Sequence, residues 1–517
     1  MENRIYARRW WTLGALALSL VIIGLDNTVL NVAIPTLQRT FDASASELQW
    51  IVDAYVLAFA GLLLVMGALG DRFGRARALR VGLVLFGAAS IAATFSIDAI
   101  HLIAARAAMG IGGALIMPST LSIIANVFPR EERGSAIAIW AGVSGLGIGL
   151  GPLVGGALIE AFDWSSVFWL NVPIVLIALT AGWFVVPESR DPASPPLDLP
   201  GAALSIAAVT ALVYGIIEAP SVGWTDPVTL GFFGAAIALF GLFGWREIHA
   251  KHPMLDLSLL RRPRFSVGAG AIGLTFFVMF AMIFGLTQYF QFVLGKSALD
   301  AGVLMLALAV GMPIGAQISI RAVAHRGTRQ VISAALVGVA IILAIVSRWD
   351  AATPDWAIMF TIFGLALAMA NVMAPATDAV MGAVPESKAG IGSAMNDLVR
   401  QLGGALGVAV IGSVMNTVYR EQMTDVVARF PLPEALAEAA RDSVGAAVTI
   451  AERIGAPAAA LAEAAKLAWV DAMAVAGPVA AAIALLTAVL VAIFLPARHE
   501  VREPGARAMS AEVAAHR

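Results

Sequence analysis

The stretch that decides the fold is Gly67-Ala68-Leu69-Gly70-Asp71-Arg72-Phe73-Gly74-Arg75-Ala76-Arg77, which lies between two long apolar runs. It holds one acid and three arginines in a turn that is too short to form a soluble domain. Such a turn must stay in water, on the side of a membrane where arginine accumulates. Its glycines let two helix ends and a tight connection approach closely. The stretch therefore predicts a multi-pass membrane protein with this turn in the cytoplasm.

Composition supports a lipid environment and argues against several classes of function. Of the 517 residues, 60% are hydrophobic and only 13% are charged, which is more apolar surface than a soluble domain can bury. The absence of Cys excludes disulfides, thiol nucleophiles and thiolate metal sites. The six His residues lack metal-ligand spacing, and no basic tract suggests nucleic acid. We expect no enzyme, catalytic residue, metal, cofactor or nucleic-acid partner.

Apolar periodicity predicts fourteen membrane spans. Lys and Arg concentrate on one side of this arrangement, and the short loops on the other side carry only Arg39, Lys296 and Arg348. This bias places both termini in the cytoplasm and the protein in the cytoplasmic (inner) membrane. The spans are expected at about 11–34, 48–69, 79–97, 100–125, 134–160, 165–187, 201–219, 228–246, 265–290, 299–321, 330–347, 355–380, 396–418 and 470–496.

An acid lies deep in the first span. Asp26 lies about 22 Å along a helix that begins near Trp11, where an ionised carboxyl is costly unless it is paired or faces a wet cavity. Burial favours its neutral form and a nearby cation favours its charged form, so a carboxyl between these influences can load and release protons. Asn27 and Asn31 share a polar face near it. A structural hydrogen bond between helices is the alternative.

A buried arginine supplies a partner for this acid. Arg106 is embedded in the fourth span and stays charged, so it needs a counter-charge, for which Asp26 is the first candidate. A purely structural salt bridge and a proton-sensitive bridge both remain open. Asp378, several residues inside Pro385 on the twelfth span, is a second candidate for a proton or substrate carboxylate.

The fifth span carries a glycine stripe. Gly147, Gly151 and Gly155 fall at successive helical turns, with Gly156 beside them and Pro152 among them. Small residues at this spacing form close-packed helix interfaces. Proline weakens the local hydrogen-bond ladder and permits bending.

These motifs carry a family resemblance. The pattern G-x-x-x-D-R-x-G-R-x-R of residues 67–77 resembles the signature loop between helices 2 and 3 of the major facilitator superfamily. The pattern Gly-x-x-x-Gly-Pro-x-x-Gly-Gly of residues 147–156 resembles its antiporter motif. In order and position, they resemble the drug:proton antiporter group with fourteen helices, which contains bacterial multidrug efflux pumps. The resemblance implies an all-α integral membrane fold with a gate at Gly67, Asp71, Arg72, Gly74 and Arg75.

The resemblance also implies how the chain is divided. The turn at 321–329 is similar to a decayed copy of the first signature loop, eight spans later, and duplicated halves are common in transporters. We expect a six-helix bundle at 1–187 and a linker with two additional helices at 188–250. A second six-helix bundle follows at 251–497, with an outer loop at 420–468 that contains amphipathic helices, and a cytoplasmic tail at 498–517. The outer loop is either a solvated hairpin or a cap.

The substrate cavity is expected to combine polar and aromatic side chains. Aromatic rings can stack on flat lipophilic cations, although lipid-facing packing is the alternative. Met109 stands where a Gln is often found in the arginine motif of the family. The candidates for lining the cavity are Asn27, Asn31, Asp53, Tyr55, Met109, Trp140, Phe280, Gln288 and Gln291.

Together with these residues, the resemblance implies a monomeric exporter of small lipophilic, often cationic, drugs in exchange for protons by alternating access, with coupling through Asp26, Arg106 and Asp378. A dedicated exporter of one antibiotic or metabolite would show the same motifs, and a lipid exporter or flippase also remains possible. A channel or receptor would need no coupled proton, and the antiporter-type glycines argue against it. A membrane enzyme is disfavoured because no nucleophile or catalytic acid pair is evident.

Overall fold

A computed structural model describes residues 2–41, 45–190, 198–251, 253, 255 and 257–496, and within these ranges the chain is helical without strands. Fourteen helices of this part are long and apolar enough to cross a membrane, as the sequence predicts. Apolar runs form helices there because every backbone polar group must be satisfied within the segment. The expected tail at 498–517 and linker residues 191–197 lie outside the described part.

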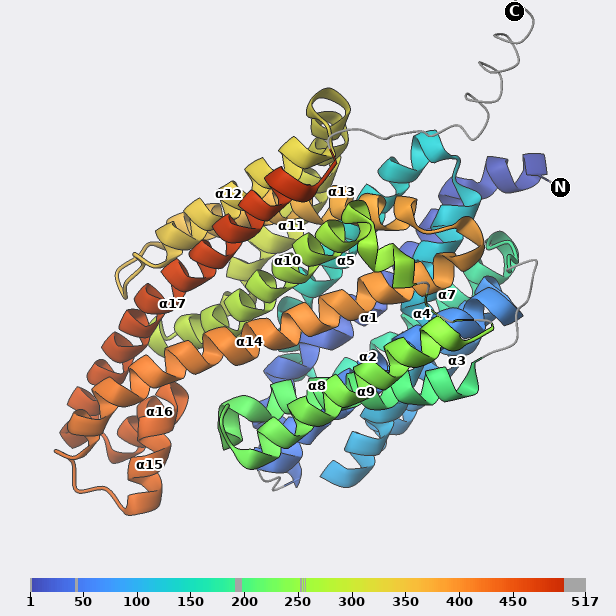
Figure 1. Ribbon diagram of the computed structural model, residues 1–517. Coiled ribbons are helices and arrows are strands. Elements are labelled where there is room, and N and C mark those ends of the chain that lie inside the picture. Colours follow the sequence, from blue (N-terminus) through green and yellow to red (C-terminus); the bar gives the residue numbers. More distant parts are fainter. Residues whose placement is uncertain are drawn as a thin grey trace, which may run out of the picture.

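The first group of helices precedes the linker and alternates in direction (Figure 1). We call the face of the molecule on which α1 begins the first face, and the face on which α1 ends the second face. The group consists of α1 (Glu2–Phe41), α2 (Ala45–Phe73), α3 (Arg75–Thr94), α4 (Ala99–Val127), α5 (Arg130–Ala161), α6 (Ser166–Trp169) and α7 (Asn171–Val185).

Two further helices follow the linker and pack on each other. Helix α8 also contacts α2 of the first group and α14 of the second group. Much of α9 carries exposed apolar side chains such as Ile237 and Trp245, which suits a helix that faces lipid. Their bounds are α8 (Leu199–Val222) and α9 (Pro227–His249).

The second group forms the other side of the molecule in Figure 1. It meets the first group where α5 packs against α11 and where α2 packs against α14. Its elements are η1 (Leu257–Arg261), α10 (Pro263–Gln288), the π turn η2 (Tyr289–Val293), α11 (Ala298–Arg326), α12 (Thr328–Val346), α13 (Asp355–Ala383), η3 (Glu386–Lys388), α14 (Ala389–Val427) and α17 (Ala459–Phe494).

Two short helices lie on the second face between α14 and α17, which confirms the predicted amphipathic helices. They are α15 (Glu434–Asp442) and α16 (Val444–Ile454), followed by the turn η4 (Ala456–Ala458). The membrane helices on either side are longer than expected, because α14 continues to Val427 and α17 begins at Ala459. Parts of the predicted loop at 420–468 are therefore helical extensions of α14 and α17.

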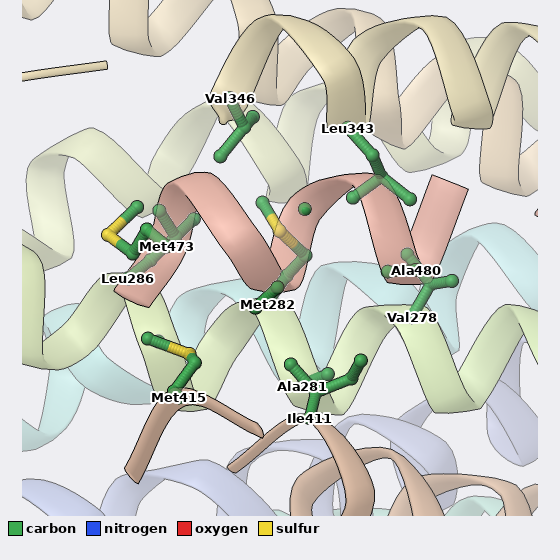
Figure 2. Close-up of a pocket in the computed structure, with 13 residues that line it drawn as sticks. Val278, Ala281, Met282, Leu286, Leu343, Val346, Ile411, Met415, Met473 and Ala480 are labelled. Carbon is green, nitrogen blue, oxygen red and sulfur yellow. The ribbon is translucent and has the colours of Figure 1, made fainter. Parts of the chain in front are cut away.

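An apolar cavity of about 40 Å³ lies inside the second group (Figure 2). It is bounded by α10, α12, α14 and α17, and its walls include Met282, Met415 and Met473. This volume accommodates a water or a methyl group and is far below the several hundred Å³ of a drug-sized pocket. The helices are thus closely packed in this conformation.

Candidate functional site

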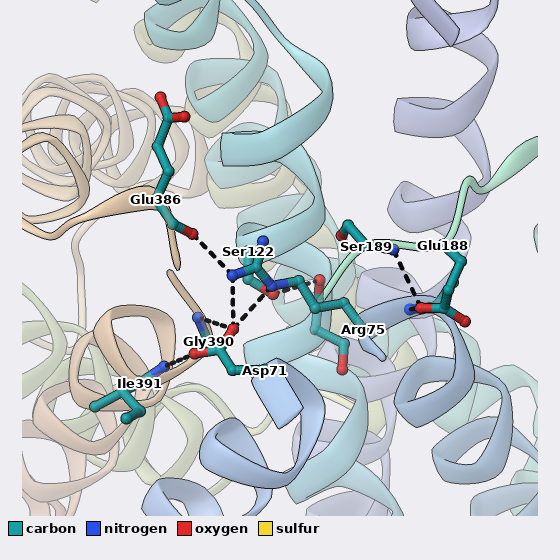
Figure 3. A network of polar contacts seen from close by, with 10 residues as sticks. Asp71, Arg75, Ser122, Glu188, Ser189, Glu386, Gly390 and Ile391 are labelled. Carbon is teal, nitrogen blue, oxygen red and sulfur yellow. Dashed lines mark hydrogen bonds and ion pairs between the residues drawn. The ribbon is translucent and has the colours of Figure 1, made fainter. Parts of the chain in front are cut away.

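The turn between α2 and α3 is bonded to the start of α14 (Figure 3). The Asp71 carboxylate accepts hydrogen bonds from the backbone N–H of Gly390 at 2.9 Å and of Ile391 at 3.2 Å. These amides begin a helix, where unpaired N–H groups and the helix dipole favour an anion. Arg75 Nε donates to Asp71 Oδ1 at 2.8 Å, and Arg75 Nη2 donates to the Glu386 carbonyl at 2.8 Å. We call these five residues the latch.

Two glycines permit this close approach. A Cβ atom on Gly67 would lie 2.6 Å from the Gly390 carbonyl oxygen, too close for any side chain. Gly74 has φ of 118°, a conformation that L side chains rarely adopt. Arg72, by contrast, directs its guanidinium over the ring of Phe73 at 5.2 Å, outside the latch. Of the five residues predicted to form a gate, the structure therefore brings Gly67, Gly74, Asp71 and Arg75 together.

The segment after α7 completes the latch, which the sequence analysis did not anticipate. Glu188 Oε1 accepts a hydrogen bond from the backbone N–H of Ala76 at 3.0 Å, and the Ser189 carbonyl accepts from that of Arg75 at 2.9 Å. These bonds satisfy amides at the start of α3 that have no partner within the helix. No local pattern identifies Glu188 as a cap, because the helix that it caps begins more than 100 positions earlier.

The second candidate site is a buried ion pair between α1 and α4. Arg106 Nη1 and Asp26 Oδ2 are 2.5 Å apart, and both side chains are at most 2% exposed. Arg106 Nε also donates to the Ile51 carbonyl at 3.1 Å, and the guanidinium lies 4.5 Å from the centre of the Tyr55 ring. The pairing of Asp26 with Arg106 expected from the sequence is therefore present.

The other oxygen of this carboxylate is held by a residue that the sequence analysis missed. Asn171 Nδ2 donates to Asp26 Oδ1 at 3.3 Å and to Ser90 Oγ at 3.1 Å, and Ser90 Oγ in turn donates to the Phe168 carbonyl at 2.9 Å. Asn171 opens α7 on the second face. Polar residues are common at helix starts, so its sequence position does not distinguish it. The four helices α1, α3, α4 and α7 meet at Asp26.

The glycine stripe of α5 packs against the helix that carries Asp26. A Cβ on Gly24 of α1 would lie 3.0 Å from the Ile148 amide nitrogen, and one on Gly155 would lie 2.7 Å from Val29 Cγ2. Thr28 Oγ1, which lies against Gly151, donates to the Ile148 carbonyl at 3.0 Å. Gly147 lies against Gly24, and Gly156 is buried. The side chain of Pro152 lies outside the described part.

A second row of glycines on α5 faces α11. A Cβ on Gly149 would lie 2.8 Å from the Ala309 amide nitrogen, and one on Gly145 would lie 2.7 Å from Met312 Cε. Helix α5 is therefore held tightly between α1, which carries Asp26, and a helix of the second group. Backbone atoms meet directly in both the α1–α5 and the α5–α11 interface, so side-chain motion alone cannot absorb a displacement. A displacement of α1 would therefore move α5 and, through it, α11.

The predicted cavity residues are divided between the two groups of helices. Tyr55, Met109 and Trp140 are fully buried, and Phe280 lies against Gly404, where a Cβ would be 3.2 Å from the ring. Four further candidates are half-buried, and the side chain of Asn31 is outside the described part. The half-buried ones are Asn27 and Asp53 toward the second face, with Gln288 at the end of α10 and Gln291 in η2.

Asp378 lies far from Asp26. Its Oδ1 would be 4.0 Å from a Cβ on Gly134, near the start of α5 on the first face. Asp26 instead lies beside Asn171, at the opposite end of the bundle. The structure thus separates the two carboxylates that the sequence analysis grouped as coupling candidates.

Comparison with known proteins places this geometry in a family. The profile of the Major Facilitator Superfamily matches residues 16–408. The chain belongs to the major facilitator superfamily. In this chain, Asp71 and Arg75 of the latch lie at the turn between the second and third spans, and the glycine stripe lies in the fifth span.

Relatives within the superfamily include two proteins that align along almost the whole chain. The tetracenomycin C resistance and export protein of Streptomyces glaucescens is 33% identical over 96% of this chain and 94% of its own length. The multidrug efflux pump LfrA of Mycolicibacterium smegmatis is 35% identical over 95% of this chain and 97% of its own length. A bacterial homologue of the human lysosomal transporter Spinster shares the superfamily fold, with a TM-score of 0.57 and 20% identity over 96% of this chain and 99% of that chain.

Proposed function

We propose that this protein exports lipophilic, often cationic, compounds across the cytoplasmic membrane in exchange for protons. The observation that carries the proposal is the buried Asp26–Arg106 pair, because an ionisable pair inside a membrane is usually functional. Relatives named for drug export and resistance support drugs as the cargo. The relative named for tetracenomycin C also supports the alternative of an exporter dedicated to one compound. Transport assays with a panel of substrates would distinguish such an exporter from a broad pump.

Protonation of Asp26 would act on the contacts of α1. The ionised carboxylate is neutralised by Arg106 and held by Asn171. Once it is protonated, the attraction between α1 and α4 falls, while Arg106 keeps the Ile51 carbonyl and the Tyr55 ring as neighbours. The resulting shift of α1 would pass to α5 through the glycine interface and from α5 to α11. In this scheme, each proton that moves down 100 mV supplies about 2.3 kcal/mol.

The latch would close the cytoplasmic side of the transport path. The arginine bias favours a cytoplasmic position for the first face and for both termini. The latch lies on that face and is closed in this structure. This conformation would therefore be the one that is shut toward the cytoplasm. Residues 1–187 and 251–497 would then move as two bundles, with residues 188–250 as an added pair of helices and the monomer as the working unit. Asp378 would contribute from the cytoplasmic side.

The test is transport by purified protein in liposomes with an imposed pH gradient and ethidium as the cargo. We expect Asp26→Asn to abolish protonophore-sensitive export while retaining exchange of ethidium for ethidium, which needs no net proton movement. The retained exchange shows that the variant is folded. Asp98→Asn, which alters an exposed helix-capping acid on the second face, is the matched control and should export normally. Proton-coupled export by Asp26→Asn would overturn the assignment.

A further inference from the structure

A second group of buried polar side chains lies on α14, apart from the Asp26–Arg106 pair. Asn396, Asp397 and Arg400 are respectively 0%, 1% and 2% exposed. Arg400 lies ten residues beyond Gly390 of the latch, which corresponds to about 15 Å along a helix. The group therefore lies near the middle of a hydrocarbon layer about 30 Å thick.

The arginine of this group is stacked on aromatic rings from two other helices. Its guanidinium carbon lies 4.3 Å from the centre of the Trp140 ring on α5 and 5.0 Å from that of Phe276 on α10. Trp140 Nε1 donates to Thr120 Oγ1 at 3.1 Å, which fixes the indole. Because α5 belongs to the first group of helices and α10 and α14 to the second, the cluster spans the interface at which the two groups would separate.

Most polar atoms of the cluster have no partner. Within the described part of the chain, Arg400 Nε and Nη1, Asp397 Oδ2 and Asn396 Oδ1 make no hydrogen bond. Arg400 Nη2 makes one long bond, at 3.5 Å, to Thr377 Oγ1. The three-residue spacing of Asp397 and Arg400 suggests an ion pair. Among the described residues no direct contact joins them, although the two opposite charges attract each other. Arg106, by contrast, uses Nε and Nη1 on a carbonyl and a carboxylate.

Buried polar atoms without hydrogen bonds at this depth require an explanation. Asp397 Oδ1 accepts from Asn396 Nδ2 at 3.3 Å, but the four free atoms remain unsatisfied, whereas buried polar atoms normally have a partner and are costly to leave without one. The free atoms comprise two donors on Arg400 and two acceptors on Asn396 and Asp397. The Arg400 guanidinium itself lies over the rings of Trp140 and Phe276. Such a set is complementary to a flat ligand that carries both kinds of hydrogen-bonding group.

We propose that Asn396, Asp397 and Arg400, with the Trp140 ring, form a substrate subsite for planar aromatic compounds that carry a carbonyl or phenolate oxygen beside a hydrogen-bond donor. The ligand oxygen accepts from the guanidinium, and the ligand donor binds the acid or the amide. The ring stacks on Trp140 when the two groups of helices separate. This inference rests on the proposed export function and names a substrate class for it.

The subsite predicts discrimination between two lipophilic cations. Daunorubicin carries hydroxyl groups beside quinone carbonyls, whereas tetraphenylphosphonium has neither a donor nor an acceptor. A hydrogen bond to a charged group changes affinity by about tenfold or more. We expect Arg400→Gln and Asp397→Asn each to raise the KM for daunorubicin export by about tenfold, with the KM for tetraphenylphosphonium kept within about twofold. Arg348→Gln, which changes an exposed arginine, should alter neither value.

Two measurements separate this subsite from a structural role and from the export proposal. The first is the pair of KM values in liposomes, and equal changes for both probes would overturn the subsite. The second is equilibrium binding of daunorubicin to purified protein, which needs no transport. A loss of affinity of about tenfold in Arg400→Gln supports the subsite. An unchanged affinity in Arg400→Gln, or no binding by the wild type, overturns it. Arg400→Lys, which keeps the charge but loses the planar donors, serves if Arg400→Gln does not fold. Wild-type protein that binds daunorubicin but exports neither probe would refute export alone.

Discussion

Replacing Asp71 with asparagine isolates the charge that holds the latch closed. The substitution preserves the size of the side chain but makes it neutral. Its bond to Arg75 lies within one group of helices, so it contributes similarly whether the latch is open or closed. Among the described residues, the bonds from the Gly390 and Ile391 amides are the ones that join the two groups through this carboxylate.

The size of the effect follows from those two bonds. A hydrogen bond to a charged group is worth about 1 kcal/mol more than one to a neutral group. Loss of the charge should therefore destabilise the closed latch by about 2 kcal/mol, which shifts its equilibrium about 30-fold toward opening. The retained bond from Arg75 to the Glu386 carbonyl keeps the shift from being larger.

The assay uses the absence of Cys from the natural chain. Ser393→Cys places a single thiol at a fully buried position of α14, one helical turn beyond Gly390, where a water-soluble maleimide reacts only when the latch opens. We expect the labelling rate to rise about 30-fold when Asp71→Asn is added. Asp98→Asn is the control, since its acid is exposed on the second face. An unchanged rate in Asp71→Asn, or an equal rise in the control, would refute the reasoning.

Further substitutions test packing, pairing and capping. Gly149→Ala should lower the unfolding free energy by about 1–3 kcal/mol, because its Cβ would meet backbone at 2.8 Å. Gly231→Ala should melt like the wild type, because beyond its own helix backbone a Cβ there would meet no described atom within 4 Å; equal melting temperatures of the two variants would contradict this. Asp26→Asn and Arg106→Gln should each lower the free energy of unfolding by about 3–5 kcal/mol, and the double variant should lower it by less than the sum of the two. Additive decreases in this double-mutant cycle would show that the two side chains do not interact. Glu188→Ala should lower the free energy of unfolding by about 1 kcal/mol, because the Ala76 amide at the start of α3 loses its cap, and an unchanged melting temperature would show that this cap does not stabilise the protein.

The fourteen spans and the ion pair could be predicted from the sequence for physical reasons. An apolar run of about twenty residues has few alternatives to a membrane helix. A buried arginine such as Arg106 needs a counter-charge, and Asp26 was the strongest candidate within the first spans. The glycine spacing of α5 likewise identified a close helix interface, because only small residues permit one.

Contacts that depend on how helices are rotated and placed could not be predicted. Asn171 and Glu188 reach their partners only after helices distant in sequence come together. The same holds for Arg400, whose spacing from Asp397 suggested an ion pair but whose guanidinium stacks on the Trp140 ring instead. Asp378 was grouped with Asp26 on burial alone, and the direction of α13 places it at the other end of the bundle.

The most direct test of the central claim is infrared difference spectroscopy of the purified protein between high and low pH. If Asp26 gains and loses the coupled proton, the wild type should show the C=O stretch of a protonated carboxylic acid at low pH, and Asp26→Asn should lack that component. Drug binding at constant pH should reduce the same band, since exchange requires the proton to leave. Identical carboxyl bands in the wild type and Asp26→Asn, over the pH range in which transport occurs, would contradict the account.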